Sequence, residues 1–360
     1  MTDSAPPRDS MTPLERLRAF RAGEAYDRIP CSAMLSDHAA LVLGVSTAEY
    51  NHSPGLMARG QIAAYRRYGH DGVAVGPSLP GFAEAAGSKL AFPEASNPFV
   101  AEPAVKLPSD FERLPQVDPH RSGRLPLFLE ALALLVEEVG AEVPVAAAIG
   151  GPFTTAANLR GTEQFLRDIT RDPDFARQLL EYSLDIMLGF VRAAASLPIG
   201  FNLADPVASG TVVSARVYRE FALPYERRLI QEIVALTGRA PVLHICGKTN
   251  RIWQDMAETG AGSLSLDDVI DLAEAKAAVG DRITLSGNVR PTDSMYLGTP
   301  QIVEENVKEC LRKAWDTPKG FILSVGCGLP VNSPPANVHA LVNAARVYGR
   351  YPLDPARFAA

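Results

Sequence analysis

A histidine and a cysteine lie two residues apart at the end of an apolar run, as His244 and Cys246, and Cys327 follows a second apolar run. In a β-strand, side chains at positions i and i+2 project from the same face, so an imidazole and a thiolate can reach one point. Zinc prefers sulfur and nitrogen ligands, and three protein ligands with one open position are typical of catalytic zinc. The spacing therefore predicts a metal site made of His244, Cys246 and Cys327.

The same residues also fit a purely structural role. Buried free cysteine packs as a small hydrophobe, and one His-x-Cys pair is less specific than two close pairs of ligands. The four cysteines do not form the pattern of a disulfide framework, and we expect them to stay reduced. Cys31 and Cys310 are assigned to packing or to the surface, which leaves Cys246 and Cys327 for metal.

Composition sets the class of protein. With 360 residues, 47% of them hydrophobic, the chain is long enough for one large barrel or for two domains. A net charge of −6 without long basic runs argues against nucleic acid and anionic membranes as partners. No apolar run approaches the length of a membrane span, and the N-terminus has no signal-peptide pattern. We expect a cytoplasmic protein with residues 1–13 disordered; the oligomeric state is left open, and a homodimer is compatible with the sequence.

Strand and helix patterns alternate along the chain. Helices are predicted at 12–20, 54–68, 127–139, 161–171, 173–196 and 214–237, and strands at 29–34, 72–77, 143–150, 199–205, 241–246, 262–267, 282–287 and 320–326. Residues 93–126 are rich in proline and lack periodicity, which predicts an irregular insertion. Eight alternating strands favour a single (β/α)8 barrel over residues 14–355, preceded by a helical extension, rather than a doubly wound sheet. No Gly-x-Gly-x-x-Gly or P-loop pattern opens a helix.

The active site of a (β/α)8 barrel lies at the C-terminal ends of its strands. The polar residues at the C-terminal ends of the predicted strands would meet there: Asp205, His244, Cys246, Asp267, Asn288 and Cys327. Asp205 fits a general base or a ligand for a substrate amine, and equally a helix cap or salt bridge. His38, after the first strand, can reach the mouth or simply complete a hydrogen bond.

Five segments together resemble the uroporphyrinogen decarboxylase superfamily, and within it the methylcobalamin:coenzyme M methyltransferases and their bacterial relatives. They are Asp205-Pro206-Val207-Ala208-Ser209, Leu243-His244-Ile245-Cys246-Gly247, Leu264-Ser265-Leu266-Asp267, Ser286-Gly287-Asn288-Val289-Arg290-Pro291 and Gly326-Cys327-Gly328. Gly151-Pro152-Phe153-Thr154 and Tyr68-Gly69-His70-Asp71-Gly72 extend the resemblance, which runs from about residue 14 to 353. Only the His-x-Cys pair with a distant cysteine separates the branches.

The resemblance implies a (β/α)8 barrel in which His244, Cys246 and Cys327 hold zinc. A thiol substrate would bind the zinc as thiolate and attack the methyl group of a methylated corrinoid carried on a separate protein. Relatives place an acidic side chain on the free metal position at rest, and Asp267 or Asp268 is the candidate here. Glu84 and Asn288 match superfamily positions that line the mouth, where they would contact the cofactor or hold a loop.

The chain departs from the family pattern at two places. Decarboxylases carry an Arg-Gln-Ala-Gly-Arg run after the first strand, whereas this chain has residues 34–39, Met-Leu-Ser-Asp-His-Ala, which argues against decarboxylation of a tetrapyrrole. Many thiol methyltransferases have Asn or Asp after His-x-Cys-Gly, whereas this chain has Lys248. That cation would steady an anionic tail of the bound molecule, or it is simply solvated.

Three hypotheses follow. The first is a zinc-dependent methyltransferase that uses methylcobalamin or another corrinoid as methyl donor and a small thiol, or tetrahydrofolate in a demethylation pathway, as acceptor. The second is a lyase of the decarboxylase type without metal, and the third is a non-catalytic barrel with structural zinc. The corrinoid-ligand pattern Asp-x-His-x-x-Gly occurs once, at 118–123, but no strand precedes it, so the corrinoid is expected on a partner protein.

Overall fold

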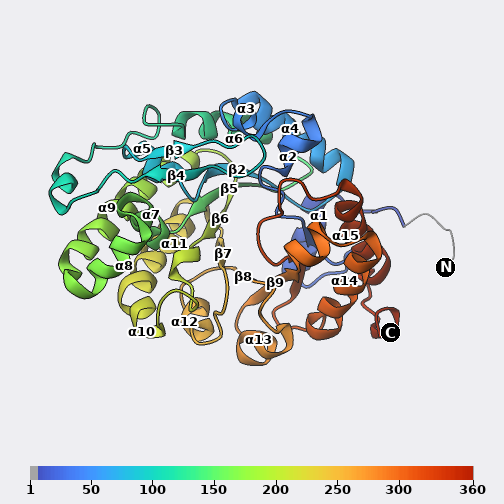
Figure 1. The fold of residues 1–360 in the computed structure, drawn as a ribbon. Helices are drawn as coiled ribbons and strands as arrows, with labels where there is room; N and C mark the ends of the chain where they lie inside the picture. The colour runs from blue at the N-terminus through green and yellow to red at the C-terminus, as the bar shows by residue number, and fades with distance from the viewer. Residues whose placement is uncertain (1–6, 360) are drawn as a thin grey trace.

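The computed structural model describes residues 7–359. An eight-stranded parallel sheet curls around the centre of the molecule, and helices cover its outside (Figure 1). Paired strands follow the order β1-β10-β9-β8-β7-β6-β5-β2. Helical segments separate consecutive strands of this sheet along the chain, which confirms the predicted (β/α)8 barrel.

The barrel strands lie close to their predicted limits. They are β1 (Cys31–Ser32), β2 (Val73–Ser78), β5 (Val145–Gly150), β6 (Gly200–Ala204), β7 (Val242–Ile245), β8 (Ser263–Leu266), β9 (Thr284–Val289) and β10 (Phe321–Val325). Every residue of β8 is buried, because a parallel strand in a barrel is covered on both faces.

Helices cover the outside of the sheet. The α-helices are α1 (Pro13–Ala22), α2 (His38–Leu43), α3 (Thr47–Asn51), α4 (Pro54–Tyr68), α5 (Gly81–Ala85), α6 (Leu125–Val139), α7 (Pro152–Arg160), α8 (Thr162–Arg171), α9 (Pro173–Ala194), α10 (Ala215–Val217), α11 (Leu223–Thr237), α12 (Trp253–Ala257), α13 (Leu272–Val279), α14 (Pro300–Ala314) and α15 (Pro335–Tyr348). Short 3-10 segments are η1 (Pro108–Arg113), η2 (Pro206–Ala208) and η5 (Pro355–Arg357), and π-helical turns are η3 (Tyr218–Ala222) and η4 (Pro291–Tyr296).

The N-terminal helix shows why the sequence pattern predicted it. The Thr12 hydroxyl accepts a hydrogen bond from the Glu15 backbone N–H, and the Glu15 carboxylate accepts one from the Thr12 backbone N–H, so two unpaired donors are satisfied. Pro13 occupies the first turn, where its missing N–H costs nothing. Gly23 ends the helix with φ of 70°, a left-handed conformation that glycine adopts without strain.

The sheet begins at β1 and ends at β2, and Asp71 connects these two strands. Its backbone N–H donates to the Cys31 carbonyl at 2.9 Å, and its carboxylate accepts from the Cys31 N–H at 2.6 Å. The same carboxylate accepts from Arg16 at 2.5 Å and from Arg28 at 2.6 Å, with all three side chains buried. A buried ion cluster therefore closes the barrel where strand pairing stops.

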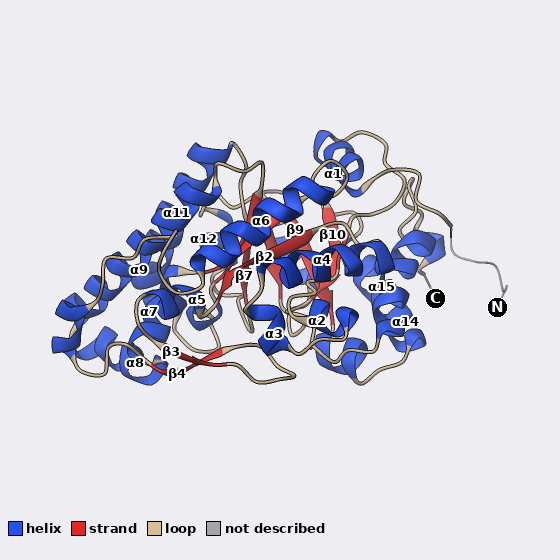
Figure 2. Cartoon of the chain, turned by 90° about the horizontal axis from the view of Figure 1, so that it is seen from above, coloured by secondary structure: helices blue, strands red, loops and turns tan. Residues whose placement is uncertain are grey.

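The insertion predicted as irregular is partly ordered. Strands β3 (Lys89–Ala91) and β4 (Phe99–Glu102) pair antiparallel, and Figure 2 shows this hairpin away from the barrel strands. The exposed Lys89 and Glu102 side chains pair across it at 3.3 Å. Because β4 is mostly exposed, its sequence lacks the apolar alternation by which strands are predicted.

The two ends of the described chain lie on the same side of the molecule (Figures 1 and 2). Residues 1–6 of the segment predicted as disordered lie outside the described residues, and in the remainder Asp9 pairs with Arg28 and Arg346. The domain limits of 14 and 355 stay a prediction. Among the helices of residues 7–359, none has the length and apolar character needed to cross a membrane.

Candidate metal centre

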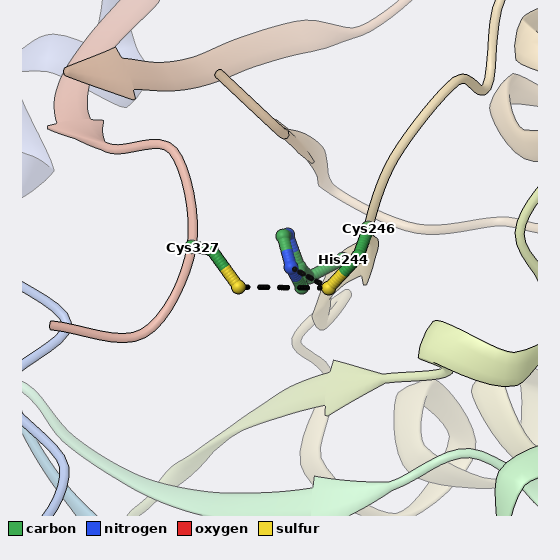
Figure 3. A group of neighbouring side chains, drawn as sticks. All are labelled: His244, Cys246 and Cys327. Carbon is green, nitrogen blue, oxygen red and sulfur yellow. Dashed lines mark hydrogen bonds between the residues drawn. The ribbon is translucent and has the colours of Figure 1, made fainter. Parts of the chain in front are cut away.

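The structure brings His244, Cys246 and Cys327 together. His244 lies in β7, Cys246 follows that strand directly, and Cys327 lies in the loop after β10, which is separated from β7 in the sheet by β8 and β9. Figure 3 shows the two cysteine side chains extending toward each other from opposite sides, with the His244 imidazole close to Cys246. One potential ligand atom from each of the three residues lies within 4.8 Å of the others.

The loop that carries Cys327 is fixed on both sides. The Gly326 N–H donates to the Val289 carbonyl at 2.8 Å, and the Leu329 N–H donates to the Met34 carbonyl at 3.0 Å. Met34 and Ser36 have φ of 43° and 44°, a left-handed region that non-glycine residues rarely occupy. Such strain is common at functional sites, and here it lies in the loop after β1 that supports Cys327.

Ser265 orients the His244 ring. The ring Nδ1 lies 3.1 Å from the Ser265 carbonyl oxygen, which only accepts, so this contact places the proton on Nδ1. The other ring nitrogen, Nε2, then faces Cys246 with its lone pair, 3.0 Å from Sγ. Metal-binding histidines are usually held in this way, with one nitrogen donating to a carbonyl and the other free for the metal.

The distances fit a tetrahedral metal ion after a small outward movement of the ligands. Ordinary Zn–S and Zn–N bond lengths require about 3.8 Å between two sulfurs and about 3.5 Å between sulfur and nitrogen. The corresponding separations are 3.5 Å between Cys246 and Cys327 and 3.0 Å between Cys246 and His244. Two thiolates and an imidazole are a donor set that suits zinc.

The contact between the two sulfur atoms shifts their pKa values in opposite directions. A hydrogen bond from Cys246 lowers the pKa of the Cys327 thiol to about 4, and nearby His244 acts in the same direction against burial. The hydrogen bond to Cys327 raises the pKa of Cys246, and burial adds to this. The hydrogen bond between the two thiols therefore favours the thiolate form of Cys327 over that of Cys246.

The turn after Cys246 requires glycine. Gly247 has φ of 71°, and a Cβ atom there would lie 2.5 Å from Thr211 Oγ1. Two side chains hold the turn: the Gly247 N–H donates to Asp267 Oδ2 at 2.8 Å, and the Lys248 N–H donates to Thr211 Oγ1 at 3.0 Å. The loops after β6 and β8 thus position Cys246 between them.

The two candidate acids have different surroundings. Asp267 uses both carboxylate oxygens on backbone N–H groups, Oδ2 for Gly247 and Oδ1 for Val269. Asp268 packs against the residue before Cys327, because a Cβ atom at Gly326 would lie 2.9 Å from the Asp268 Cβ. Burial raises the pKa of the Asp268 carboxyl to about 6, and the charges of Asp267 and Cys327 add to this.

Asp205 lies in a buried network rather than on an open surface. Its carboxylate accepts from the backbone N–H groups of Phe153 and Thr154 at 3.2 and 2.6 Å and from the Thr154 hydroxyl at 2.5 Å. Burial raises the pKa of Asp205 to about 6, and burial together with the charge of Asp205 raises the pKa of Glu226. Tyr218 donates to Glu226 at 2.6 Å. In this structure Asp205 therefore caps the N-terminus of α7, which is one of the two non-catalytic roles that the sequence allowed. A catalytic role for Asp205 stays a prediction.

Glu226→Gln is expected to stabilise the protein at alkaline pH. Because the pKa of Glu226 is raised in the folded state, the native chain holds a proton that the unfolded chain releases above about pH 4.3, so stability falls as pH rises. Glutamine stays neutral, keeps the hydrogen bond that Tyr218 donates, and places an amide N–H where Glu226 Oε1 has no partner, next to the Asp205 charge. We expect urea unfolding at pH 8 to show a gain of at least about 1 kcal/mol, with a smaller gain at pH 5. Glu226→Ala, which leaves Tyr218 unpaired, should lose stability; equal losses in both variants would contradict this explanation.

The remaining predicted site residues are placed as follows. Glu84 pairs with Arg124 at 2.9 Å, and Asn288 donates to the carbonyls of Asp267 and Ile270, so both hold loops in this structure. Lys248 is exposed, and no hydrogen bond or ion pair of its side chain occurs within residues 7–359. Their predicted contacts with a cofactor stay predictions.

Other predicted residues lie away from the thiols. His38 is buried, with Nδ1 donating to the Val331 carbonyl at 2.8 Å and Tyr68 bound at 3.0 Å, which is the hydrogen-bonding alternative. Cys31 and Cys310 are buried, as packing requires. Sequence reasoning missed Ser265 and Thr211 as supports of the ligands. For Ser265 a signal existed, since a polar residue within a buried apolar strand needs a partner.

A (β/α)8 barrel with two thiols and an imidazole gathered at one end of its strands defines a class of barrel proteins able to hold a thiophilic metal. The chain belongs to the uroporphyrinogen decarboxylase (URO-D) family, whose model matches residues 12–348. The resemblance inferred from the motifs is thereby confirmed.

Similar proteins come from both the methyltransferase and the decarboxylase branches of the family. The methylcobamide:CoM methyltransferase MtaA of Methanosarcina barkeri is 30% identical over 339 residues, covering 92% of this chain and 97% of the relative. A methyltransferase structure from Methanosarcina mazei has a TM-score of 0.83 at 28% identity and covers 93% of this chain and 98% of that one. The uroporphyrinogen decarboxylase of Pseudoalteromonas atlantica is 26% identical over 291 residues, covering 79% and 80%.

Proposed function

We propose that this protein is a zinc-dependent methyltransferase, which moves a methyl group from a methylated corrinoid on a partner protein to a small thiol. The observation that carries the proposal is the meeting of two sulfurs and a free imidazole nitrogen within 4.8 Å at the C-terminal ends of the strands. Relatives named methylcobamide:CoM methyltransferase, similar over nearly the whole chain, support the same reaction class.

His244, Cys246 and Cys327 would hold the zinc ion. When bound, zinc supplies a Lewis acid that keeps an incoming thiol deprotonated near neutral pH. Other residues of the chain hold the ligands in place: Ser265 sets the imidazole orientation, and Gly247 and Asp267 fix the position of Cys246. Methyl transfer then joins the acceptor sulfur to the methyl carbon, while the electron pair of the cobalt–carbon bond stays on cobalt.

We propose Asp268, rather than Asp267, as the acid that would bind the zinc ion until substrate replaces it. Asp267 already uses both oxygens on the N–H groups of Gly247 and Val269, so its carboxylate positions the Cys246 turn. The Asp268 carboxylate interacts with Asp267 and with its own backbone N–H but with no N–H group of another loop among the described residues, and it lies beside the loop of Cys327.

The decarboxylase alternative is less well supported. Residues 33–43, which form the loop and helix after β1, contain no arginine to hold the carboxylates of a tetrapyrrole. A decarboxylase would also have no use for two thiols and an imidazole at its centre. Tetrahydrofolate as acceptor stays a second proposal beside the thiol.

The test is methyl transfer from free methylcobalamin to a set of small thiols and to tetrahydrofolate. Loss of the cobalt–methyl absorbance and mass detection of the methylated product should both require the zinc-loaded chain. Zinc content measured by mass spectrometry should be one ion per chain. A protein that binds no zinc and methylates none of the acceptors would refute the proposal.

Lys248→Met is expected to weaken the use of anionic thiols selectively. Lys248 is an exposed cation two residues after Cys246, so it can attract the charged end of an acceptor. We expect KM for 2-mercaptoethanesulfonate to rise about two- to fivefold, the usual scale of an exposed ion pair, and KM for neutral 2-mercaptoethanol to stay constant. Lys319→Met, which changes an exposed lysine before β10, is the matched control. Equal effects on both thiols would show that Lys248 does not contact the acceptor's charge.

A further inference from the structure

The two sulfur atoms of the metal centre are close enough to react with each other. Cys246 Sγ and Cys327 Sγ are 3.5 Å apart, and both residues are partly exposed. The other two cysteines are buried, Cys31 completely and Cys310 with 2% exposure. All four are free thiols. One reactive pair and two protected cysteines therefore coexist in the chain.

Local geometry leaves both side chains room to approach. A disulfide requires about 2.05 Å between the sulfurs, so the pair must close by about 1.5 Å. Cys327 lies between two glycines in the bend after β10, and Cys246 is followed by Gly247 at the end of β7. Neither cysteine is inside a helix or within the paired part of a strand. Rotation of the side chains with small loop adjustments can supply the movement.

We propose that Cys246 and Cys327 are a peroxide-sensitive pair, which forms an intramolecular disulfide when the metal centre is empty. Each thiol loses one proton and one electron, a sulfur–sulfur bond forms, and hydrogen peroxide accepts two electrons and two protons to give two water molecules. The attack is stepwise: one sulfur is oxidised to sulfenic acid, and the other displaces water from it.

The disulfide would prevent zinc from binding at the metal centre. Oxidation would remove both sulfur ligands, and an imidazole with at most one carboxylate is too small a ligand set to hold zinc tightly. A dithiol such as dithiothreitol restores both thiols by exchange, so the switch is reversible. The bond itself depends only on the sulfur geometry, whereas its effect on methyl transfer rests on the proposed function.

The test starts from the full chain freed of zinc by a chelator and treated with hydrogen peroxide. Unfolding in alkylating reagent should count two reactive thiols after treatment and four before it. Mass analysis of the unreduced digest should find the peptides of Cys246 and Cys327 joined, at about 2 Da below the sum of the two separate peptides. Zinc-loaded protein should form this link more slowly, because the metal holds both sulfurs.

Variants separate the pair from other cysteines. Cys310→Ala should still form the link, and both Cys327→Ser and Cys246→Ser should not. Two independent single variants guard against one of them failing to fold, which circular dichroism will reveal. Recovery of zinc binding after dithiothreitol, measured with a zinc-sensitive dye, gives a readout other than activity.

The outcomes distinguish this inference from the proposed function. If peroxide converts Cys246 or Cys327 to sulfinic acid without a link, or leaves four thiols, the inference is wrong even where the reduced chain binds zinc and transfers methyl groups. If the link forms but the reduced chain neither binds zinc nor transfers methyl groups, the pair is confirmed and the proposed function fails.

Discussion

Cys327→Ser is expected to abolish zinc binding and methyl transfer while the barrel stays folded. Cys327 would supply one of the three sulfur and nitrogen donor atoms that lie within 4.8 Å of one another, and a serine hydroxyl is a poor zinc ligand at neutral pH because it stays protonated. Loss of an outer partner of a metal ligand already costs about 10–100-fold in affinity, so loss of a ligand should cost more. We expect methyl transfer from methylcobalamin to fall to the rate without enzyme.

The same variant separates a catalytic centre from a structural one. Cys327 lies in a loop, and the barrel core does not depend on its sulfur, so the unfolding free energy should stay within about 1 kcal/mol of that of the zinc-free parent. Structural zinc, in contrast, contributes directly to folding. Cys310→Ala removes a sulfur from α14 and should keep zinc and turnover. Unchanged zinc content in Cys327→Ser would disprove the ligand assignment, and large destabilisation on zinc loss would favour the structural role.

The strands and the convergence of His244, Cys246 and Cys327 were predictable from the sequence because both depend on local spacing. The apolar runs of β7 and β10 predicted strands, and parallel strands in a barrel bring their C-terminal ends to one face. Cys327 therefore had to lie on the same face as His244 and Cys246. Side chains two residues apart along β7 point to the same side, so the His244 imidazole and the Cys246 sulfur face the same point, as Figure 3 shows.

The partners of the acids were not predictable, since they come from distant parts of the chain. Asp205 lies at the end of a strand, which suggested an exposed site residue. Its carboxylate instead accepts hydrogen bonds from the N-terminus of α7, about 50 residues earlier in the chain. Glu84 forms an ion pair with Arg124, which lies near the end of the insertion. Local pattern decides which strand end carries a carboxylate. Only the tertiary structure decides whether that carboxylate binds a helix terminus, an arginine or a substrate.

The buried ion cluster at the closure of the barrel is the most sensitive site for stability. Arg16 is fully buried, Arg28 is almost so, and both donate to the Asp71 carboxylate. Asp9 and Asp27 complete their surroundings, at 2.8 Å from Arg28 and 2.6 Å from Arg16. Charges taken out of water are tolerated only while each keeps its partner. Asp71 has the further task of bonding to the Cys31 backbone across the gap between β1 and β2.

Asp71→Asn should therefore destabilise the protein by about 3–5 kcal/mol, the usual cost of removing one partner from a buried ion pair. Asparagine keeps the shape but leaves two buried guanidinium groups short of one negative charge, and its amide cannot accept all the hydrogen bonds that the carboxylate receives. Glu181→Gln removes one partner of the exposed Arg228–Glu181 pair and should cost less than about 1 kcal/mol. Urea unfolding followed by tryptophan fluorescence, on zinc-free protein at pH 7, compares the two variants with the parent. If both variants unfold at the same urea concentration, the cluster does not stabilise the closure, and the β1–β2 contact must depend on packing instead.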